Sequence, residues 1–533
     1  MMRFFGIFYW LVTSCVFAQS DTWWVYFTDK NCNTSISLSK SAIDKRLKKK
    51  IPIDFYDYAI CQSYIDTVSH YDVIIRRHSR WLNAVSIKTN SSEVLDLLLS
   101  HKFIKKIKPV LKLKPETKYF SNELLDVSPS LRLSSSLLYG ASFNQIDMLG
   151  GVGLHNEGYL GNGINIAVFD AGFIGVESLP IFDNLWLNNQ IIDTYDFVDN
   201  DSDVFVGSVH GTMVLSTMGG YMADSLIGTA PEANYMLFRT EDSASETLIE
   251  EDYWAAAAEY ADSVGVDIIN SSLGYTILYD DTLNSHSYMD MDGNSTIITK
   301  AADLAASRGI LVVNSAGNSG NSNWYYIGAP ADGDSVLAVG AVNAMGQIAS
   351  FSSRGPTYDG RIKPNICAQG VLSTVADQDS TIRYANGTSF SAPIIAGLSA
   401  CLWQALLTEK PDVTNMDVFQ VIQESAHLFE SPNDSLGYGI PNFYLGFLNA
   451  LELTHLIDTV QVYPNPYTDY FVIDYYIKED SYIKIYNSLG QIILSKFIKK
   501  DFNRVIVDEL SQISQGVYFL TINNLQLHPI IKK

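Results

Sequence analysis

The sequence predicts an α/β protein: a central parallel sheet with helices on both faces, preceded by a small α+β domain and followed by a small all-β sandwich. At 533 residues the chain is too long for one domain and should hold about three. Its middle part alternates short apolar runs with helix-like segments, which is typical of a parallel sheet covered on both sides. Both ends instead carry short strands of alternating polarity.

Composition narrows the class of protein. A hydrophobic content of 47% and a charged content of 18% indicate a folded protein with a large core. The formal net charge of −22 argues against a nucleic-acid partner. We therefore expect a soluble, exported protein.

Residues 1–18 have the features of a signal peptide. Arg3 is followed by an apolar run, and Val16-Phe17-Ala18 precedes Gln19 in the small-residue pattern of a cleavage site. A lipoprotein signal with the lipid on Cys15 is the alternative. Either signal predicts export through the periplasm to the medium or the cell surface, and no other stretch approaches the ~20 apolar residues of a spanning helix.

Residues 19–139 form the predicted α+β domain, which ends in the Ser-rich stretch at Ser134–Ser136. The domain is rich in basic residues, whereas residues 140–458 are acidic. Such a contrast predicts association helped by charge and weakened by salt, unless the lysines only solvate an outer face. The basic residues include Lys45, Arg46, Lys48, Lys49, Lys50, Arg76, Arg77, Lys105 and Lys106.

Four cysteines follow the signal peptide: Cys32, Cys61, Cys367 and Cys401. They are too few and too far apart to indicate a disulfide framework. We expect no essential disulfide.

Residues 140–458 contain the predicted parallel sheet. Strands are expected at Ile164–Phe169, Tyr235–Phe238, Asp267–Asn270, Ile310–Asn314 and Ser335–Val339. Helices are expected at Gly211–Gly219, Ser245–Val264, Thr296–Arg308 and Phe390–Leu407. In such sheets the chemistry collects at the carboxyl ends of the strands.

Ser389 is the candidate nucleophile. It lies in the small-residue turn Asn386–Pro393, directly before an apolar helical stretch. The N–H groups at a helix N-terminus, together with the helix dipole, can stabilise an oxyanion. A serine is a poor nucleophile at its free pKa, so this interpretation requires a base, an acid that orients the base and a further oxyanion donor.

Three residues can supply those groups. Asp170 ends an apolar strand-like run, His210 opens His210-Gly211-Thr212, and Asn318 closes Ser315-Ala316-Gly317-Asn318. Asp170 would orient His210, His210 would take the Ser389 proton, and Asn318 would donate to the oxyanion. Taken singly, each motif is more often a cap or a turn.

Together and in this order, the motifs resemble those of the subtilisin-like serine peptidases. Ser271–Gly274 and Phe351–Pro364 strengthen the resemblance, which covers about residues 140–458. It implies a serine endopeptidase that acts on polypeptide substrates through an acyl-enzyme. It also implies that residues 19–139 are a propeptide, which assists folding and occupies the active site until it is removed.

The resemblance further implies a substrate cleft in which backbone groups pair with an extended peptide. The substrate-binding residues would be Ser272, Leu273, Gly274, Ser315, Ala316 and Gly317. Gly328 and Pro330 would lie near the floor of the first specificity pocket. Two departures, at Ala171-Gly172-Phe173 and at Cys367–Gly370, affect only local loops.

No cofactor or metal is predicted, although a structural calcium ion stays possible. Asp290–Asn294 resembles part of an EF-hand loop, but Ala301 stands where the twelfth-position Glu is required. A turn and a helix start are expected there. His155, His286 and His427 lack a catalytic context and are interpreted as structural or surface residues.

Residues 459–533 are the predicted sandwich, with alternating strands and Gly and Asn turns. They resemble the C-terminal sorting domains of the type IX secretion system of Bacteroidetes, which implies that the secretion machinery is a partner. Without that resemblance, these residues would be interpreted as a carbohydrate- or surface-binding module.

The sequence as a whole therefore predicts a secreted serine endopeptidase made as a zymogen. An α/β-hydrolase esterase would require G-x-S-x-G and the order Ser, Asp, His, whereas here the serine comes last, after the aspartate and the histidine. An inactive surface adhesin would tolerate the loss of a triad residue, and none is missing.

Overall fold

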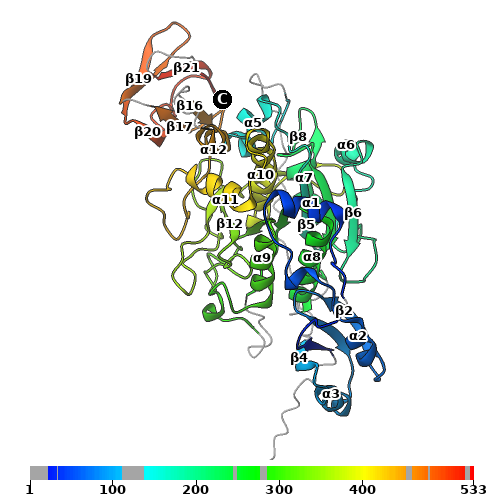
Figure 1. The fold of residues 1–533 in the computed structure, drawn as a ribbon. Coiled ribbons are helices and arrows are strands. Elements are labelled where there is room, and N and C mark those ends of the chain that lie inside the picture. Colours follow the sequence, from blue (N-terminus) through cyan, green and yellow to red (C-terminus); the bar gives the residue numbers. More distant parts are fainter. Residues whose placement is uncertain are drawn as a thin grey trace, which may run out of the picture. The chain divides into compact units, whose positions relative to one another are not determined.

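The computed structural model describes residues 22–32, 34–110, 137–243, 249–276, 285–451, 459–477, 480–522 and 528–533 (Figure 1). The predicted signal peptide, Cys15 and the Ser134–Ser136 linker lie outside these residues. The chain forms two compact units. One contains Met1–Ser35 with Tyr58–Lys112, and the other contains Ile36–Asp57 with Leu113–Lys533.

The first unit is a small α+β domain, as predicted. Its strands β1 (Thr22–Phe27), β2 (Ile74–Ser79), β3 (Ala84–Lys88) and β4 (Ile104–Val110) pair in the antiparallel order β2-β3-β1-β4. Helices α2 (Gln62–Ser69) and α3 (Ser92–Leu99) complete it. Val25, Val85 and Ile87 share its core with Val68 and Leu98, so strands and helices bury a common apolar layer.

The expectation about cysteines was wrong, because Cys32 and Cys61 form a disulfide with their Cα atoms 5.9 Å apart. The separation of 29 residues that argued against pairing is a distance along the chain. The chain leaves this unit after Ser35 and re-enters it at Tyr58, so the two cysteines meet where it leaves and returns.

The second unit is built on a parallel sheet of strand order β13-β12-β11-β10-β5-β9-β6. Its strands are β5 (Asn165–Asp170), β6 (Ile191–Asp196), β9 (Asn234–Arg239), β10 (Ile268–Ser271), β11 (Leu311–Ser315), β12 (Val336–Val342) and β13 (Ile366–Gln369). Five of them match the predicted runs to within two or three residues. β6 and β13 were not predicted.

The predicted helices are α7 (His210–Gly219), α8 (Ile249–Val264), α9 (Ile297–Ser307) and α10 (Thr388–Glu409). The predicted start of α8 at Ser245 lies outside the described residues. Shorter helices are α4 (Phe143–Asp147), α5 (Gly151–Asn156), η2 (Pro180–Phe182), α6 (Asp183–Leu187), η3 (Tyr288–Asp290), α11 (Asn415–Glu424) and α12 (Phe443–Ala450). Two small hairpins join β7 (Tyr221–Met222) to β8 (Leu226–Ile227) and β14 (Ser373–Ala376) to β15 (Ile382–Ala385).

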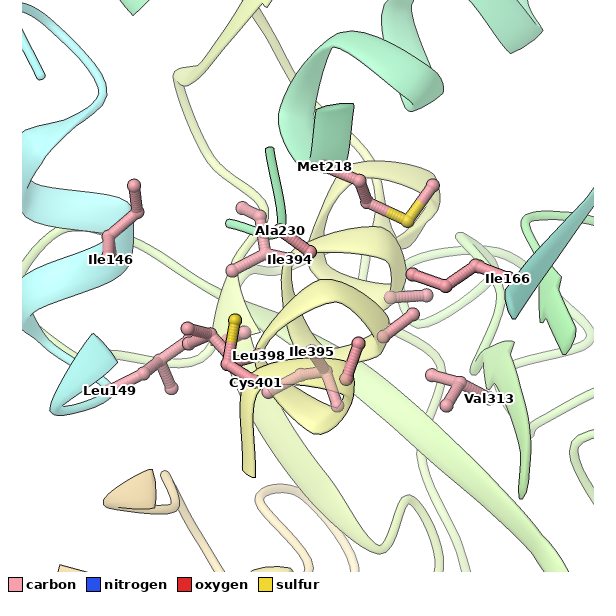
Figure 2. Packing of buried hydrophobic residues seen from close by; sticks show 14 of the residues in the cluster. Ile146, Leu149, Ile166, Met218, Ala230, Val313, Ile394, Ile395, Leu398 and Cys401 are labelled. Atoms are coloured by element: carbon pink, nitrogen blue, oxygen red, sulfur yellow. The ribbon is translucent and has the colours of Figure 1, made fainter. Parts of the chain in front are cut away.

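Helices cover both faces of the sheet. Successive strand residues point to opposite faces, so each strand presents apolar side chains to the helices on both sides. In β5, Phe169 packs against Trp254 of α8 with their ring centroids 5.3 Å apart, whereas its neighbour Val168 belongs to the core on the α10 side. In Figure 2, Ile394, Ile395 and Leu398 of α10 lie among apolar side chains from the sheet and from other helices.

Helix α10 is apolar all round. Among the described residues it is the one helix long and apolar enough to cross a membrane, but 89% of the relevant window is buried inside the protein. The burial identifies α10 as a core helix, and its first turn delivers Ser389 to the edge of the sheet.

Residues Ile36–Asp57 differ from the expected organisation. They lie within the predicted N-terminal domain, yet they belong to the second compact unit. They contain α1 (Lys40–Lys48) and the short helix η1 (Phe55–Asp57). We call residues 36–57 the arm.

The C-terminal residues form the predicted all-β sandwich. β16 (Thr459–Tyr463), β17 (Phe471–Ile477) and β20 (Asp501–Val507) make one antiparallel sheet. β18 (Ser481–Tyr486), β19 (Ile492–Ile498), β21 (Gly516–Ile522) and β22 (His528–Lys532) make the other. Phe471 and Ile473 from the first sheet share a core with Ile483, Ile485 and Leu520 from the second.

Candidate active site

Asp170 and His210 are joined by a two-point contact at the carboxyl edge of the sheet. Asp170 is the last residue of β5 and is fully buried, and His210 opens α7. The Nδ1 atom of His210 lies 2.8 Å from Oδ1 and 3.0 Å from Oδ2 of Asp170. The carboxylate therefore fixes the ring with a proton on Nδ1, which leaves Nε2 as the basic nitrogen.

Gly211 allows this contact. A Cβ atom at Gly211 would lie 2.4 Å from the carbonyl oxygen of Gly172 and 2.8 Å from the ring of Phe173. With no side chain there, the Gly211 N–H donates to that same carbonyl at 3.1 Å. The first turn of α7 thus packs directly on the loop after β5, which brings His210 to Asp170.

Ser389 is the second residue of α10, and its hydroxyl contacts the carbonyl oxygen of Ser272 at 3.4 Å. Pro393, four residues later, has no N–H to donate to the Ser389 carbonyl. That carbonyl accepts a hydrogen bond from the Ser272 hydroxyl at 2.9 Å instead. The helix start is therefore tied to the segment that follows β10.

Asn318 is held by the residue that precedes the serine. Its Oδ1 atom accepts hydrogen bonds from the backbone N–H of Thr388 at 2.9 Å and from the Thr388 hydroxyl at 3.0 Å. An amide has one acceptor and one NH₂ group, so these contacts leave Nδ2 as the group that can donate to a ligand. The backbone N–H of Ser389 is close by, in the first turn of α10.

A cavity of about 220 Å³ joins these groups. Its lining includes His210, Asn318 and Ser389, together with five of the six expected substrate-binding residues: Ser272, Leu273, Gly274, Ser315 and Gly317. Ala316 is the exception, because it is fully buried among Ile327, Ala331 and Ala338. Gly328 lines the cavity, whereas Pro330 is not among its lining residues.

Comparison with known proteins decides the family. The model of the subtilase family matches residues 161–447, more than half of the chain. The chain belongs to the subtilase family. Residues 22–122 match the peptidase S8 propeptide domain of Bacteroidota, and residues 461–533 match a secretion system C-terminal sorting domain.

Individual relatives agree with this family. The thermophilic serine proteinase of Bacillus sp. strain AK1 is 31% identical over 48% of this chain and 57% of its own length. Subtilisin E of Bacillus subtilis is 30% identical over 51% of this chain and 63% of its own length. Subtilisin of Bacillus pumilus is 30% identical over 51% of this chain and 87% of its own length. The chain thus spans about three fifths of the length of the first two relatives.

The cavity of this subtilase also contains residues that the sequence analysis missed: Ala171, Glu241, Thr276, Ser319 and Ser353. Glu241 follows β9 by two residues, so the strand-end rule that identified Asp170 would have found it. Ser353 lies within the Phe351–Pro364 motif, and its hydroxyl accepts the Ser319 N–H at 3.0 Å. It therefore braces the loop that carries Asn318.

Three further histidines, His155, His286 and His427, have structural contacts. His155 is buried, and its ring lies 2.8 Å from the Tyr139 hydroxyl and 2.9 Å from the Thr229 carbonyl oxygen. Burial lowers the pKa of His155 to about 4, so the ring is neutral at pH 7. His286 pairs with Glu251, and Nδ1 of His427 lies 2.9 Å from the backbone nitrogen of Ile440.

The acidic stretch at Asp290–Asn294 forms the expected turn and helix start. Oδ1 of Asp292 accepts the N–H groups of Asn294 at 2.8 Å and Ser295 at 2.7 Å, and α9 begins shortly afterwards with Thr296 as its N-cap. Within the described ranges, no group of three or more His, Cys, Asp or Glu side chains is arranged to hold a metal ion.

Proposed function

We propose that this subtilase is a secreted serine endopeptidase with Asp170, His210 and Ser389 as its catalytic triad and Asn318 as an oxyanion donor. The observation that carries the proposal is the two-point contact between Asp170 and His210 at the cavity that also contains Ser389 and Asn318. Residues from β5, α7, α10 and the loop after β11 converge there, as acyl transfer requires.

In the proposed reaction, Nε2 of His210 takes the hydroxyl proton as Ser389 Oγ bonds to the substrate carbonyl carbon. Asp170 stabilises the resulting imidazolium through the Nδ1 proton. The carbonyl oxygen becomes an oxyanion, which accepts hydrogen bonds from Asn318 Nδ2 and the Ser389 backbone N–H. His210 then protonates the leaving amine, and water hydrolyses the acyl-enzyme by the same steps with His210 again as base.

The substrate would lie extended along the segments Ser272–Gly274 and Ser315–Gly317 and pair with their backbone as an added strand. The small side chains of these segments suit such a backbone approach. Gly328 and Thr276 line the same cavity and would contact a substrate side chain.

Kinetics of two serine variants test the assignment. Ser389→Ala should lower kcat by about a millionfold, the size of the effect when the nucleophilic serine of subtilisin is removed. Ser391→Ala is the matched control, because Ser391 lies two residues further along α10 and its buried hydroxyl only bonds the Thr388 carbonyl, at 3.0 Å. Full activity in Ser389→Ala, or an equal loss in both variants, would contradict the proposal.

We also propose that the propeptide blocks the cleft until it is removed. The matching propeptide model and the basic composition of the segment support this role. Residues 19–139 added to the mature enzyme should inhibit it, and less strongly at high salt. Activity that is unaffected by the added propeptide would rule the role out.

The C-terminal sandwich would direct export through the periplasm by the type IX secretion machinery. The match to a sorting domain and the apolar core shared by the two sheets of the sandwich support this role. Deleting residues 459–533 should leave kcat/KM unchanged but hold the protein in the periplasm of a host that has this system. Continued secretion of the truncated protein would contradict the proposal.

A further inference from the structure

The arm, residues 36–57, belongs to the propeptide by sequence and to the peptidase by structure. The propeptide model spans residues 22–122, which include the arm. In the fold, however, the arm belongs to the compact unit that contains the catalytic residues. Figure 1 draws α1 in blue among the green elements of that unit, and α1 contacts α8.

The contact lies at the carboxyl-terminal ends of two peptidase helices. Lys45 Nζ donates to the carbonyl oxygen of Gly265, just after α8, at 2.7 Å. Lys49 Nζ donates to that of Gly309, just after α9, at 2.9 Å. The last carbonyls of a helix lack partners within it and carry the negative end of its dipole, so lysines are favoured at this place.

Ion pairs reinforce the contact, and those of Arg46 are buried. Arg46 is 3% exposed, and its Nη2 atom lies 2.6 Å from Oδ1 of Asp262 in α8 and 3.0 Å from Oδ1 of Asp57 within the arm. Lys45 Nζ also reaches Oδ2 of Asp267 at 2.5 Å. Buried charges are tolerated only when they are paired in this way, so the arm and the peptidase surface are chemically matched.

The backbone at both helix ends also leaves space for the arm. Gly265 and Gly309 have φ values of +88° and +91°, the left-handed conformation that ends many helices. A Cβ atom at Gly265 would lie 3.1 Å from the backbone nitrogen of Ala42, and one at Gly309 would lie 2.7 Å from Cδ1 of Ile51. The two glycines therefore end the helices and also make room for the arm.

This surface is at the edge of the sheet opposite the catalytic residues. Helices in such folds run antiparallel to the strands, so the ends of α8 and α9 meet the amino ends of β10 and β11. Asp267 immediately precedes β10, whereas Ser272 of the cavity immediately follows it. Five residues of extended chain separate the two edges by roughly 16 Å.

We propose that the arm is a second attachment site, which holds the propeptide on the peptidase even after the chain between them is cut. A propeptide attached in this way does not depend on the substrate cleft alone for its binding. The inference rests on the matches to the propeptide and subtilase families and does not require Ser389 to be the nucleophile.

The test uses the full chain carrying Ser389→Ala, after gel electrophoresis has verified that this variant does not cleave itself. A recognition sequence for a site-specific protease is inserted between residues 122 and 139, the chain is cut there, and the rate of propeptide dissociation is measured by size-exclusion chromatography and by dilution of a fluorescent label. Arg46→Gln should dissociate about a hundredfold faster than the parent, because one partner of a buried ion pair is lost.

Two further variants make the test decisive. Asp262→Asn removes the partner on the peptidase side and should accelerate dissociation similarly. Lys48→Gln, an exposed position of the same helix, should dissociate at the parent rate. Parent-like dissociation of both Arg46→Gln and Asp262→Asn would overturn the proposal. So would an effect confined to one of them, because that residue would then act within its own segment, or an equal effect of Lys48→Gln.

Discussion

The two edges of the central sheet are both polar, but they differ in how their polar groups are paired. At the carboxyl edge, the Ser389 hydroxyl contacts the Ser272 carbonyl oxygen at a long 3.4 Å, and Ser389 lines a cavity with His210 and Asn318. At the amino edge, Asp262 and Asp267 are buried and lie within 2.6 Å of a cationic side chain of the arm.

The difference shows how one sheet can support both chemistry and attachment. Groups that must react or bind substrate are positioned by their neighbours while one atom stays available in the cavity, as Asn318 Nδ2 does. Groups that hold the arm are buried and paired with its cations, so the loss of one partner is costly. Substitutions at the two edges should therefore have separable effects.

The largest effect on stability is expected at the amino edge. Arg46→Met leaves Asp57 and Asp262 without their shared cation in a buried site, which should destabilise the full chain by about 3–5 kcal/mol. Thermal or denaturant unfolding of the full chain measures this loss. A loss of unfolding free energy below about 1 kcal/mol would mean that water reaches these ion pairs and that they behave as exposed pairs.

At the carboxyl edge, Asn318→Ala should lower kcat about 10²–10³-fold with little change in KM, because the amide would stabilise charge that exists only in the transition state. Asp262→Asn in the mature enzyme is the matched control from the other edge and should keep the parent kcat/KM. If Asn318→Ala mainly raises KM, the residue positions substrate and does not stabilise the oxyanion.

Acid should weaken the core where α5 packs against α10, because His155 is buried there. The pKa of His155 is lowered by burial from 6.5 to about 4, so the unfolded state takes up a proton at a higher pH than the folded state. The stability that comes from the neutral ring is complete above pH 6.5 and is lost as the pH falls toward 4, by about 3 kcal/mol.

Unfolding of the mature enzyme at pH 7 and pH 4.5 tests this expectation. His155→Gln retains a donor and an acceptor for Thr229 and Tyr139 but cannot titrate, so its stability should change less over this range. An identical pH dependence in parent and variant would show that other groups cause the acid loss.

The smallest effect on stability is expected where the arm is exposed to solvent. Lys50 and Asp412 form a pair at 3.0 Å, but their side chains are 80% and 62% exposed. Exposed pairs are screened and contribute little, so Lys50→Ala should leave the unfolding temperature unchanged within error. A loss comparable to that of Arg46→Met would show that charge alone, and not burial, holds the arm.

Much of the fold and of the candidate site could be predicted from sequence because both depend on local patterns. Apolar runs fixed five strands of the sheet to within two or three residues. Asp170 ends β5 and Asn318 follows β11, and parallel topology brings such strand ends to one edge. Ala316 does not line the cavity, because its side chain packs among Ile327, Ala331 and Ala338, and a motif does not show which side chain of a loop points inward.

The arm could not be predicted, because its position depends on contacts between residues distant in sequence. Lys45 meets Asp267, which lies 222 residues further along the chain. In the sequence, a cluster of lysines that binds a partner surface looks the same as a cluster that only faces solvent. The disulfide between Cys32 and Cys61 was missed for the same reason. Sequence spacing does not measure proximity when a segment leaves one unit and returns to it.

One measurement tests most directly the claim that the carboxyl edge carries the chemistry. The mature enzyme is treated with a sulfonyl fluoride or an organophosphate, and the modified residue is located by mass spectrometry. We expect one label per molecule, on Ser389, because only a serine activated by His210 reacts readily with these reagents. A label on Ser391 or Ser353, or the same labelling in His210→Ala, would contradict the account.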